Sequence, residues 1–304
     1  MKQKRDVGII ILNYNTSEDA IHAAKSVIET TKLSYIICIA DNCSTKRGEV
    51  SVLRNARLPN VEILEIKNNG GYAKGNNEAV RYLIENYDFT YIVIMNPDVL
   101  VINDGTLDRL VTRFQHLAQE YCGIQPMVWT PYLGDAKMQT HIRTVYSYWE
   151  CIVNHSAILK RLFKKTFNAT VYQNEKPYCS ELDFEVPSGA FFLIRTDVFD
   201  DVGMFDERTF LYGEEAILGA KIKNNGYKFK FMPSEIVLHE GGKSIGSSPK
   251  RVKWYAVKYG MQSIQIYLKY YLHCNSFQIA LVKAIMVLNF LMKNILYRLG
   301  VNLH

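Results

Sequence analysis

Short apolar runs alternate with helix-like stretches over the first hundred residues. Runs of strand length lie at residues 7–13, 35–41, 61–67 and 91–95. Helices are expected at 19–30, capped by Ser17, and at 78–87. Strands separated by helices predict parallel βαβ units, whose ligands bind beyond the carboxyl ends of the strands. We therefore expect the chemistry in the loops that follow these strands.

The pattern beyond residue 100 is less regular. Residues 128–176 mix aromatic and basic side chains without a sustained period, so we assign them to variable, acceptor-facing structure. Two further helices are predicted, at 106–121 and at 214–225, the second ending at Gly226 as its C-cap. The apolar pattern also predicts strands at 184–194, 228–232 and 237–239.

The composition is that of a folded globular protein. With 304 residues, 48% of them hydrophobic and 22% charged, the chain can bury a sizeable core. Its six cysteines include no C-x-x-C pair, which argues against a zinc ribbon or a small disulfide scaffold. The apolar stretch near the start is too short for a secretory signal. We therefore expect a cytoplasmic protein with reduced thiols.

The charge is unevenly distributed. Nine Lys and Arg residues and no Asp or Glu lie between positions 241 and 304, so the formal net charge of +6 combines a tail of +9 with a body of −3. Such a tail favours a polyanionic partner, and lipid headgroups, nucleic acid and acidic glycans are all eligible. No nucleic-acid recognition motif appears, and we expect no nucleic acid partner.

The tail also has an amphipathic pattern. Residues 251–271 mix Lys with Trp and Tyr, as is typical of a membrane interface. An apolar stripe follows at spacings of four and three residues: Leu281, Ile285, Leu288, Met292, Ile295 and Leu299. Lys and Asn residues interrupt this stretch, which favours a helix lying in the interface over a full membrane span. A helix packed on the body or a dimer seam would show the same stripe.

The sequence lacks the loop motifs of two common classes of nucleotide-binding protein. Asn13, Tyr14 and Asn15 follow the first strand where a dinucleotide-binding fold would have G-x-G-x-x-G, and the chain has no P-loop motif. The glycine-rich sequence NNGGYAKGNN, which contains Asn69, Gly71 and Asn76, lies between a strand and a helix. It predicts either an anion cradle at a helix N-terminus or a tight turn.

Several ionisable residues also lie at strand or helix ends. Asp98, in the sequence NPDV, can hold a Mg²⁺ or Mn²⁺ ion that bridges two phosphates, or can form part of a type I turn. Asp41 is either a helix cap or a contact to a base or ribose. Glu214 and Glu215 open a predicted helix, where acids are also ordinary partners of the helix dipole. His239 lies beside glycines and a Lys, as in an anion or metal site.

Several sequence segments, taken in their order and spacing, indicate a protein family far more specifically than any one of them does alone. VGIIILNYNTSEDA, IADNCS, NNGGYAKGNN, MNPDV, PSGAFFLIRTDVFDDVGMFDERTFLYGEE and HEGGKS together resemble the family 2 glycosyltransferases, particularly the rhamnosyltransferase-like branch. The resemblance spans residues 7–244. It implies a GT-A fold, in which helices flank a Rossmann-like, mostly parallel central sheet. It also implies a nucleotide-sugar donor and inversion at the anomeric carbon.

The resemblance carries roles onto individual residues. Asp41 would contact the nucleobase, Asp98 would be the last acid of the DxD-type metal motif, and His239 would lie near the metal and diphosphate. Glu215 would be the general base. The remaining donor-side candidates are Asn13, Tyr14, Asn15, Asn69, Gly71, Asn76 and Asn96, and the acceptor-side candidates are Glu214 and Tyr212. The chain departs from the family pattern in having Asn96 as the first residue of the metal motif, Glu instead of Asp as the base, and Ile217 in place of a further acid.

We therefore expect a catalytic domain at residues 1–244 and a basic helical region at 245–304 that binds the membrane surface through residues 250–304. The hypothesis is an inverting enzyme, peripheral on the inner face of the cell membrane. It would move a hexosyl or deoxyhexosyl group from a UDP- or dTDP-linked sugar to a glycan or lipid-linked glycan in surface polysaccharide synthesis. A nucleotidyltransferase and a non-catalytic nucleotide-sugar or nucleic-acid binding module are the alternatives. The oligomeric state is left open.

Overall fold

A mixed sheet forms the centre of the protein. The computed structural model describes residues 2–134, 141–172, 180–241 and 253–299. The predicted domain boundary at residue 244 lies outside these residues. One half of the sheet is parallel, in the order β4-β3-β2-β6. These strands are β2 (Val7–Asn13), β3 (Tyr35–Asp41), β4 (Val61–Glu65) and β6 (Tyr91–Met95).

The other half of the sheet mixes strand directions and continues from β6 in the order β10-β8-β11-β7. Strand β10 runs antiparallel to both β6 and β8, β11 runs parallel to β8, and β7 pairs with β11 antiparallel. The bounds are β7 (Val99–Val101), β8 (Tyr121–Trp129), β9 (Leu182–Phe184, paired with β11), β10 (Phe191–Arg195) and β11 (Lys228–His239). A separate short ladder joins β1 (Gln3–Lys4) to β5 (Tyr87–Asp88).

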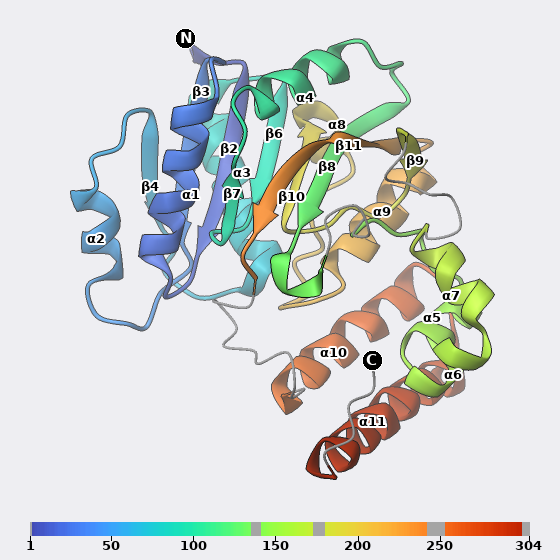
Figure 1. The fold of residues 1–304 in the computed structure, drawn as a ribbon. Coiled ribbons are helices and arrows are strands. Elements are labelled where there is room, and N and C mark those ends of the chain that lie inside the picture. Colours follow the sequence, from blue (N-terminus) through green and yellow to red (C-terminus); the bar gives the residue numbers. More distant parts are fainter. Residues whose placement is uncertain (1, 135–140, 173–179, 242–252, 300–304) are drawn as a thin grey trace.

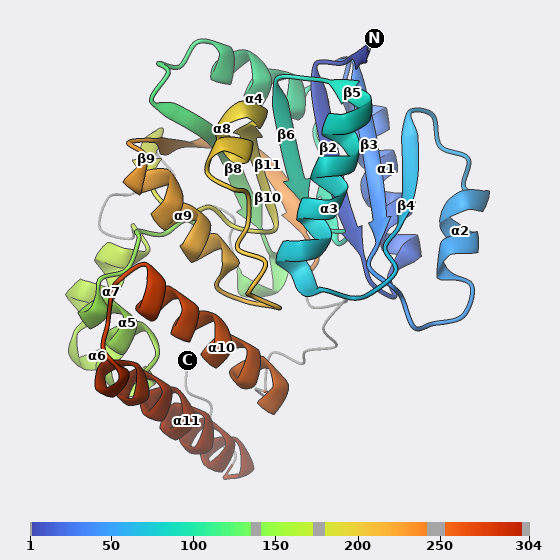
Figure 2. The same ribbon diagram turned by 180° about the vertical axis from the view of Figure 1, so that it is seen from behind.

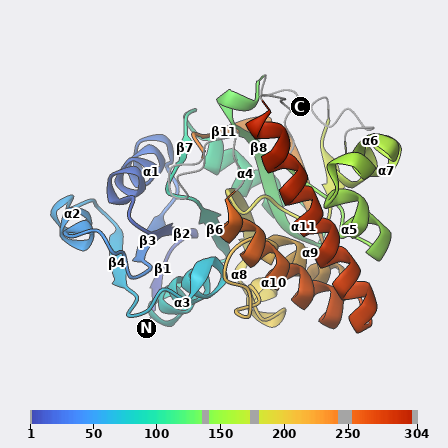
Figure 3. The same cartoon turned by 90° about the horizontal axis from the view of Figure 1, so that it is seen from below.

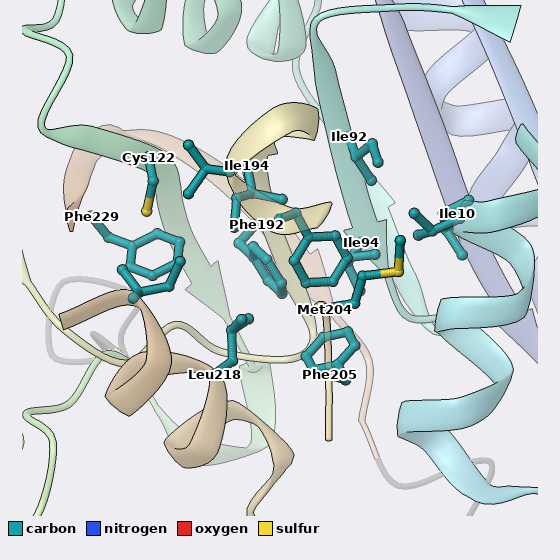
Figure 4. Close-up of a cluster of buried hydrophobic side chains, with 14 of the residues drawn as sticks. Ile10, Ile92, Ile94, Cys122, Phe192, Ile194, Met204, Phe205, Leu218 and Phe229 are labelled. Atoms are coloured by element: carbon teal, nitrogen blue, oxygen red, sulfur yellow. The ribbon is translucent and has the colours of Figure 1, made fainter. Parts of the chain in front are cut away.

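Helices cover both faces of the sheet, which explains why the central strands are apolar throughout. Helices α1 (Ser17–Thr30), α2 (Glu49–Asn55) and α4 (Thr106–Gln115) cover one face (Figure 1). Helices α3 (Gly71–Asn86), α8 (Thr196–Asp201) and α9 (Glu214–Asn224) cover the other (Figure 2). Along β2, Ile10 enters one core and Ile9 and Ile11 the other. Figure 4 shows the core beneath α9, where Leu218 faces Phe192, Phe205 and Phe229.

The observed elements correct several predicted boundaries. Helix α3 begins at Gly71 instead of residue 78, so most of the glycine-rich loop is helical. Its Gly75 packs against β2 so closely that a Cβ would lie 2.7 Å from Leu12 Cδ1. The strand predicted at 184–194 is divided into β9 and β10 by a loop, and the two strands predicted at 228–239 form one irregular strand. The helix predicted at 106–121 ends at Gln115, before β8.

The segment without predicted elements contains the 3₁₀ turn η1 (Pro131–Leu133) and three short helices. These are α5 (Tyr148–Asn154), α6 (Ala157–Leu162) and α7 (Lys164–Thr170). A capping box between Ser147 and Glu150 starts α5. Short helices separated by single turns have too few residues to show a clear period in the sequence.

The tail forms two long helices, α10 (Trp254–Tyr270) and α11 (Ser276–Arg298). Figure 3 shows them beside α5–α7. A third apolar cluster joins α5, α9, α10 and α11, and it includes Cys151, Ile217, Tyr267, Leu268 and Val282. The core therefore extends across the predicted domain boundary, and α10 is part of the same packed body as α9.

Candidate active site

A cavity of about 630 Å³ lies at the carboxyl ends of β2 and β6, beside α10. It brings together many of the predicted site residues: Tyr14, Asn69, Gly71, Asn96, Asp98, Tyr212, Glu214, Glu215 and His239. These residues come from segments separated by more than 200 positions in the chain. The predicted residues of this set therefore lie together beyond the strand ends, and their chemical roles stay predictions.

Pairing of β7 with β11 places Asp98 beside His239. His239 lies opposite Val99 in the antiparallel ladder, and the backbone N–H of Glu240 donates to the carbonyl oxygen of Asp98 at 2.9 Å. The Nε2 atom of His239 is consequently 3.3 Å from Oδ1 of the buried Asp98. The ladder therefore holds a carboxylate and an imidazole at one point in the cavity wall.

This pair fits a divalent cation that shares its coordination with a ligand. Carboxylate oxygen and imidazole nitrogen both suit Mn²⁺, and Mg²⁺ usually takes one or two carboxylates together with substrate phosphates. Asn96 lines the same cavity and adds an amide oxygen. Within the described ranges no cluster of three or more His, Cys, Asp or Glu side chains could enclose a metal ion. The remaining ligands would have to come from the bound substrate and water.

Two adjacent carboxylates lie at the N-terminus of α9. Tyr212 and Gly213 precede them with φ angles of 68° and 85°, so the chain enters the helix through a left-handed turn. Burial raises the pKa of Glu214 well above its ordinary value, and the neighbouring Glu215 raises it further. Oε2 of Glu214 is buried without a hydrogen-bond partner among the described residues. Glu214 therefore favours its protonated, neutral form.

A negative charge is better stabilised on Glu215 than on Glu214. Burial raises the pKa of Glu215 as well, but the backbone at Glu215, Gly189 and Gly213 and the positive charge of Arg143 act in the opposite direction. These groups favour the ionised form, as a proton acceptor requires. Glu215 is thus the better candidate for a general base, and its pKa is still above that of an ordinary glutamate.

Contacts among three loops hold these carboxylates in place. The N–H of Tyr72 donates to the carbonyl oxygen of Phe210 at 2.8 Å, and the Tyr72 hydroxyl donates to that of Gly189 at 2.6 Å. Gly71 permits the first contact, because a Cβ there would lie 2.1 Å from the Phe210 oxygen. Gly71 also has a φ of 87°, which favours glycine. A glycine at this position therefore serves close approach between loops.

Four predicted donor-side residues do not line the cavity. Asp41 is buried and accepts hydrogen bonds from Asn13 Nδ2 at 2.7 Å and from the hydroxyl and N–H of Ser44 at 2.6 and 3.0 Å. Asn15 accepts from the N–H groups of Thr45 and Lys46. These contacts shape the loop after β2, and a nucleobase contact by Asp41 stays a prediction.

Asn76 is the fourth of these residues. It is buried within α3 and donates from Nδ2 to the carbonyl oxygen of Tyr72 at 2.9 Å. This bond lies within one helix, as expected for a residue on the second turn of α3. Asn76 therefore supports the helix that carries Tyr72.

The cavity also contains residues that the sequence analysis missed. They include Asn42, Tyr72, Ser188, Gly189, Phe210, Tyr255 and Tyr259. Asn42 donates to Asn69 Oδ1 at 3.1 Å, and Tyr259 stacks on Phe210 with ring centroids 4.5 Å apart. The tyrosines of α10 were assigned to a membrane interface from their composition, yet Tyr255 and Tyr259 form part of the cavity wall. Their regular placement four residues apart on one helix face was a signal for packing.

Comparisons with known sequences identify the family of this chain. A family model described as glycosyltransferase like family 2 matches residues 7–255. The N-acetylglucosaminyl-diphospho-decaprenol L-rhamnosyltransferase of Mycobacterium tuberculosis is 25% identical over 248 residues, covering 79% of this chain and 78% of that protein. Rhamnosyltransferase WbbL of Escherichia coli is 26% identical over 172 residues, covering 56% of this chain and 60% of WbbL.

Solved glycosyltransferase structures share the fold. The mannosyltransferase PcManGT from Pyrobaculum calidifontis, in complex with GDP-Man and Mn²⁺, superimposes with a TM-score of 0.57 at 12% identity, covering 96% of this chain and 76% of that one. S. aureus TarS 1-349 in complex with UDP-GlcNAc gives 0.54 at 12% identity, covering 98% and 93%. At such low identity the similarity shows the fold alone, which is GT-A as expected.

Proposed function

This chain belongs to the glycosyltransferase family 2-like proteins, and we propose that it is an inverting transferase that uses a UDP- or dTDP-linked sugar and a lipid-linked glycan acceptor. Family membership makes it a glycosyltransferase and removes the alternatives of a nucleotidyltransferase and of a non-catalytic binding module. The rhamnosyltransferase relatives favour a deoxyhexosyl donor. The lipid diphosphate in the name of the mycobacterial relative favours a membrane-borne acceptor.

One observation carries the mechanism: Glu215 and the Asp98–His239 pair line the same cavity. Asp98 and His239 would hold a divalent cation beside the donor diphosphate, and this cation would supply charge neutralisation for the leaving group. Glu215 would take the proton from the acceptor hydroxyl as that oxygen attacks the anomeric carbon. Glu214, neutral and buried, supports the start of α9 beside the base.

A single displacement of this kind inverts the anomeric carbon. Attack by the acceptor oxygen from the side opposite the leaving diphosphate forms the new glycosidic bond as the old bond breaks. We call the cavity of about 630 Å³ the donor cavity. Glu215 and the Asp98–His239 pair both line it, so one sugar can be held between a base and a leaving-group site. Inversion can be checked by NMR assignment of the anomeric configuration in the product.

We propose that α11 binds the membrane surface. Its 23 residues are long and apolar enough to cross a membrane by length and composition. However, one face packs on the body, where Asn289 Oδ1 accepts from the N–H of Ala157 at 3.0 Å, and this contact favours a helix lying along the surface. The opposite face is apolar and exposed, and includes Phe277, Leu281, Leu288, Leu291, Ile295 and Leu299. Such a face beside basic residues fits the cytoplasmic leaflet of the cell membrane.

The decisive experiment compares the two adjacent carboxylates. Glu215→Gln keeps size but removes basicity, so it should lower kcat on the order of 10²-fold or more with donor binding retained. Glu214→Gln replaces a neutral acid by a neutral amide and should keep most of the activity. Steady-state kinetics with a panel of nucleotide sugars and a lipid-linked GlcNAc acceptor would measure both variants. If Glu214→Gln is the more damaging change, the base has been assigned to the wrong residue.

A further inference from the structure

A second cavity of about 330 Å³ adjoins the first, and Glu215 lies in the wall of both. Ser188, Gly189 and Tyr212 are also shared by the two linings. The new part of the lining comes mainly from residues just before and just after α5 and from α10, and includes His141, Arg143, Tyr146, His155, Ser263 and Tyr267. The volume is sufficient for a small polar ligand. A ligand here would therefore lie beside Glu215.

The guanidinium of Arg143 is a cationic group in this lining, and Glu215 acts on it electrostatically without forming an ion pair. Its side chain is solvent-accessible where it lines the cavity, and its Nη1 donates to the neutral hydroxyl of Tyr146 at 3.1 Å. Among the described residues, no carboxylate forms an ion pair with Arg143. A guanidinium has five N–H donors arranged in a fork that matches phosphate oxygens. Most of these donors are therefore available for an anionic ligand.

A second basic side chain, that of Lys160, adds positive potential near Arg143. Burial lowers the pKa of Lys160 to about 8, and repulsion by Lys293 and by Arg143 contributes to this shift. Burial lowers the pKa of His141 to about 4, with His239 and Arg143 contributing, so His141 is neutral at pH 7. Glu215 is the acidic residue in the lining. The cavity thus has a cation at one place and the base at another.

The cavity lies toward the helices that carry exposed apolar side chains. His155 follows α5 directly and precedes α6, where Ile158 and Leu162 are 56% and 70% exposed. The start of α6 is tied to α11 through the bond between Ala157 and Asn289. Figure 3 shows α5 and α6 alongside α11. An acceptor whose phosphate enters the cavity can therefore keep its lipid chain on this apolar face.

We propose that this second cavity binds the phosphate-bearing head of a lipid-linked acceptor, with Arg143 contacting the phosphate and Glu215 receiving the proton of the acceptor hydroxyl. The inference rests on the proposed function, which supplies the base and the acceptor class. It adds a binding residue and a site that is separate from the donor cavity. The reaction itself is unchanged, because Arg143 holds the acceptor and takes part in no bond that forms or breaks.

The test compares a charged with a neutral acceptor. One is GlcNAc linked through diphosphate to a short alkyl chain, and the other is the decyl glycoside of the same sugar. Arg143→Gln should raise the KM of the diphosphate acceptor about 10-fold or more, because a charge-assisted bidentate contact is lost. The donor KM should change by less than about twofold. The kcat/KM of the neutral glycoside should fall only by the factor that follows from losing a positive charge near Glu215, and this factor is common to both acceptors. Arg143→Lys should be intermediate, since it keeps the charge without the fork.

Two further variants separate binding from folding. Lys165→Gln removes one exposed positive charge from the nearby α7 and should leave both acceptors unaffected. Tyr146→Phe removes the hydroxyl that orients the guanidinium and should raise the KM of the diphosphate acceptor by a smaller factor. Binding of decyl diphosphate, measured by calorimetry at saturating nucleotide, should weaken in Arg143→Gln in parallel with the KM.

Equal losses for the charged and neutral acceptors, or unchanged decyl diphosphate affinity in Arg143→Gln, would overturn the inference. Competition between decyl diphosphate and the nucleotide sugar would place the phosphate in the donor cavity and also overturn it. Failure of the proposed function would look different: the unmodified protein would then neither transfer nor hydrolyse any donor. Decyl diphosphate binding needs no turnover, so it tests the cavity in that case as well.

Discussion

Gly189→Ala should displace the proposed base without unfolding the protein. A Cβ at this position would lie 2.5 Å from Oε1 of Glu215, whereas ordinary contact begins at about 3.4 Å. The carboxylate would therefore have to move by about 0.9 Å. The atom that moves is the end of a flexible side chain, so the cost in stability should be small. A misplacement of about 1 Å at a reacting group can lower the rate about 10²-fold.

Three measurements on Gly189→Ala test whether the base is displaced in a folded protein: kcat, the donor KM and the melting temperature. We expect kcat to fall on the order of 10²-fold, with the donor KM nearly unchanged. Gly226→Ala is the control for a glycine substitution without a clash, because its Cβ would meet nothing within 4 Å, although its φ of 79° is unfavourable for alanine. It should cost about 1 kcal/mol of stability and leave kcat intact. Full kcat in a folded Gly189→Ala would refute the placement of Glu215 as base.

The remaining predictions concern protonation, the cation and the membrane. Because the pKa of Glu215 is raised, the acid limb of kcat should lie above the usual range of a glutamate, and a limb near pH 4 would contradict this. The raised pKa of Glu214 means that the folded state holds its proton more tightly than the unfolded state, so stability is lost as pH rises. Glu214→Gln should therefore raise the melting temperature more at pH 8 than at pH 5, and an equal effect at both would exclude this cause. Asp98→Ala should abolish transfer and remove the effect of Mn²⁺ on donor binding, whereas indifference of the native enzyme to EDTA would remove the metal role. Leu288→Gln with Ile295→Gln changes two exposed side chains of α11 and should reduce co-sedimentation with anionic vesicles at unchanged activity on a short-chain acceptor; if vesicle binding persists, this face is not the contact.

The parallel half of the fold could be predicted because its signals are local. Each of the strands β2, β3, β4 and β6 is a short apolar run bounded by polar residues, and the helices between them have clear periods. The mixed half of the sheet was harder to predict from the sequence. Strand β8 is buried along most of its length but follows a helix without a glycine or proline break, so the helix was predicted to run into it. The loop between β9 and β10 contains Gly189, and its importance lies in a contact with a residue 26 positions later.

The site was predicted residue by residue, but its pairings came only from the tertiary structure. Asp98 and His239 both stood out as possible ligands, yet nothing local indicates that antiparallel pairing of β7 with β11 brings them together. Asp41 shows the reverse case. Its position at a strand end suggested a ligand contact, while the observed partners are Asn13 and Ser44. A carboxylate that ends a strand has the same sequence pattern whether it binds a ligand or shapes the next loop.

Helix α10 shows why composition alone could not assign the tail. Tyrosines and lysines on an amphipathic helix are equally suited to a membrane interface and to a polar cavity wall, because both environments have one apolar and one wet side. The structure divides them: Tyr259 faces the donor cavity and Tyr267 is buried against the body, whereas Trp254 and Tyr270 are about half exposed. Helix α10, which packs against both α9 and α11, is thus also a wall of both cavities. Contact of α11 with a membrane would therefore act on the helix that borders both the proposed donor cavity and the proposed acceptor cavity.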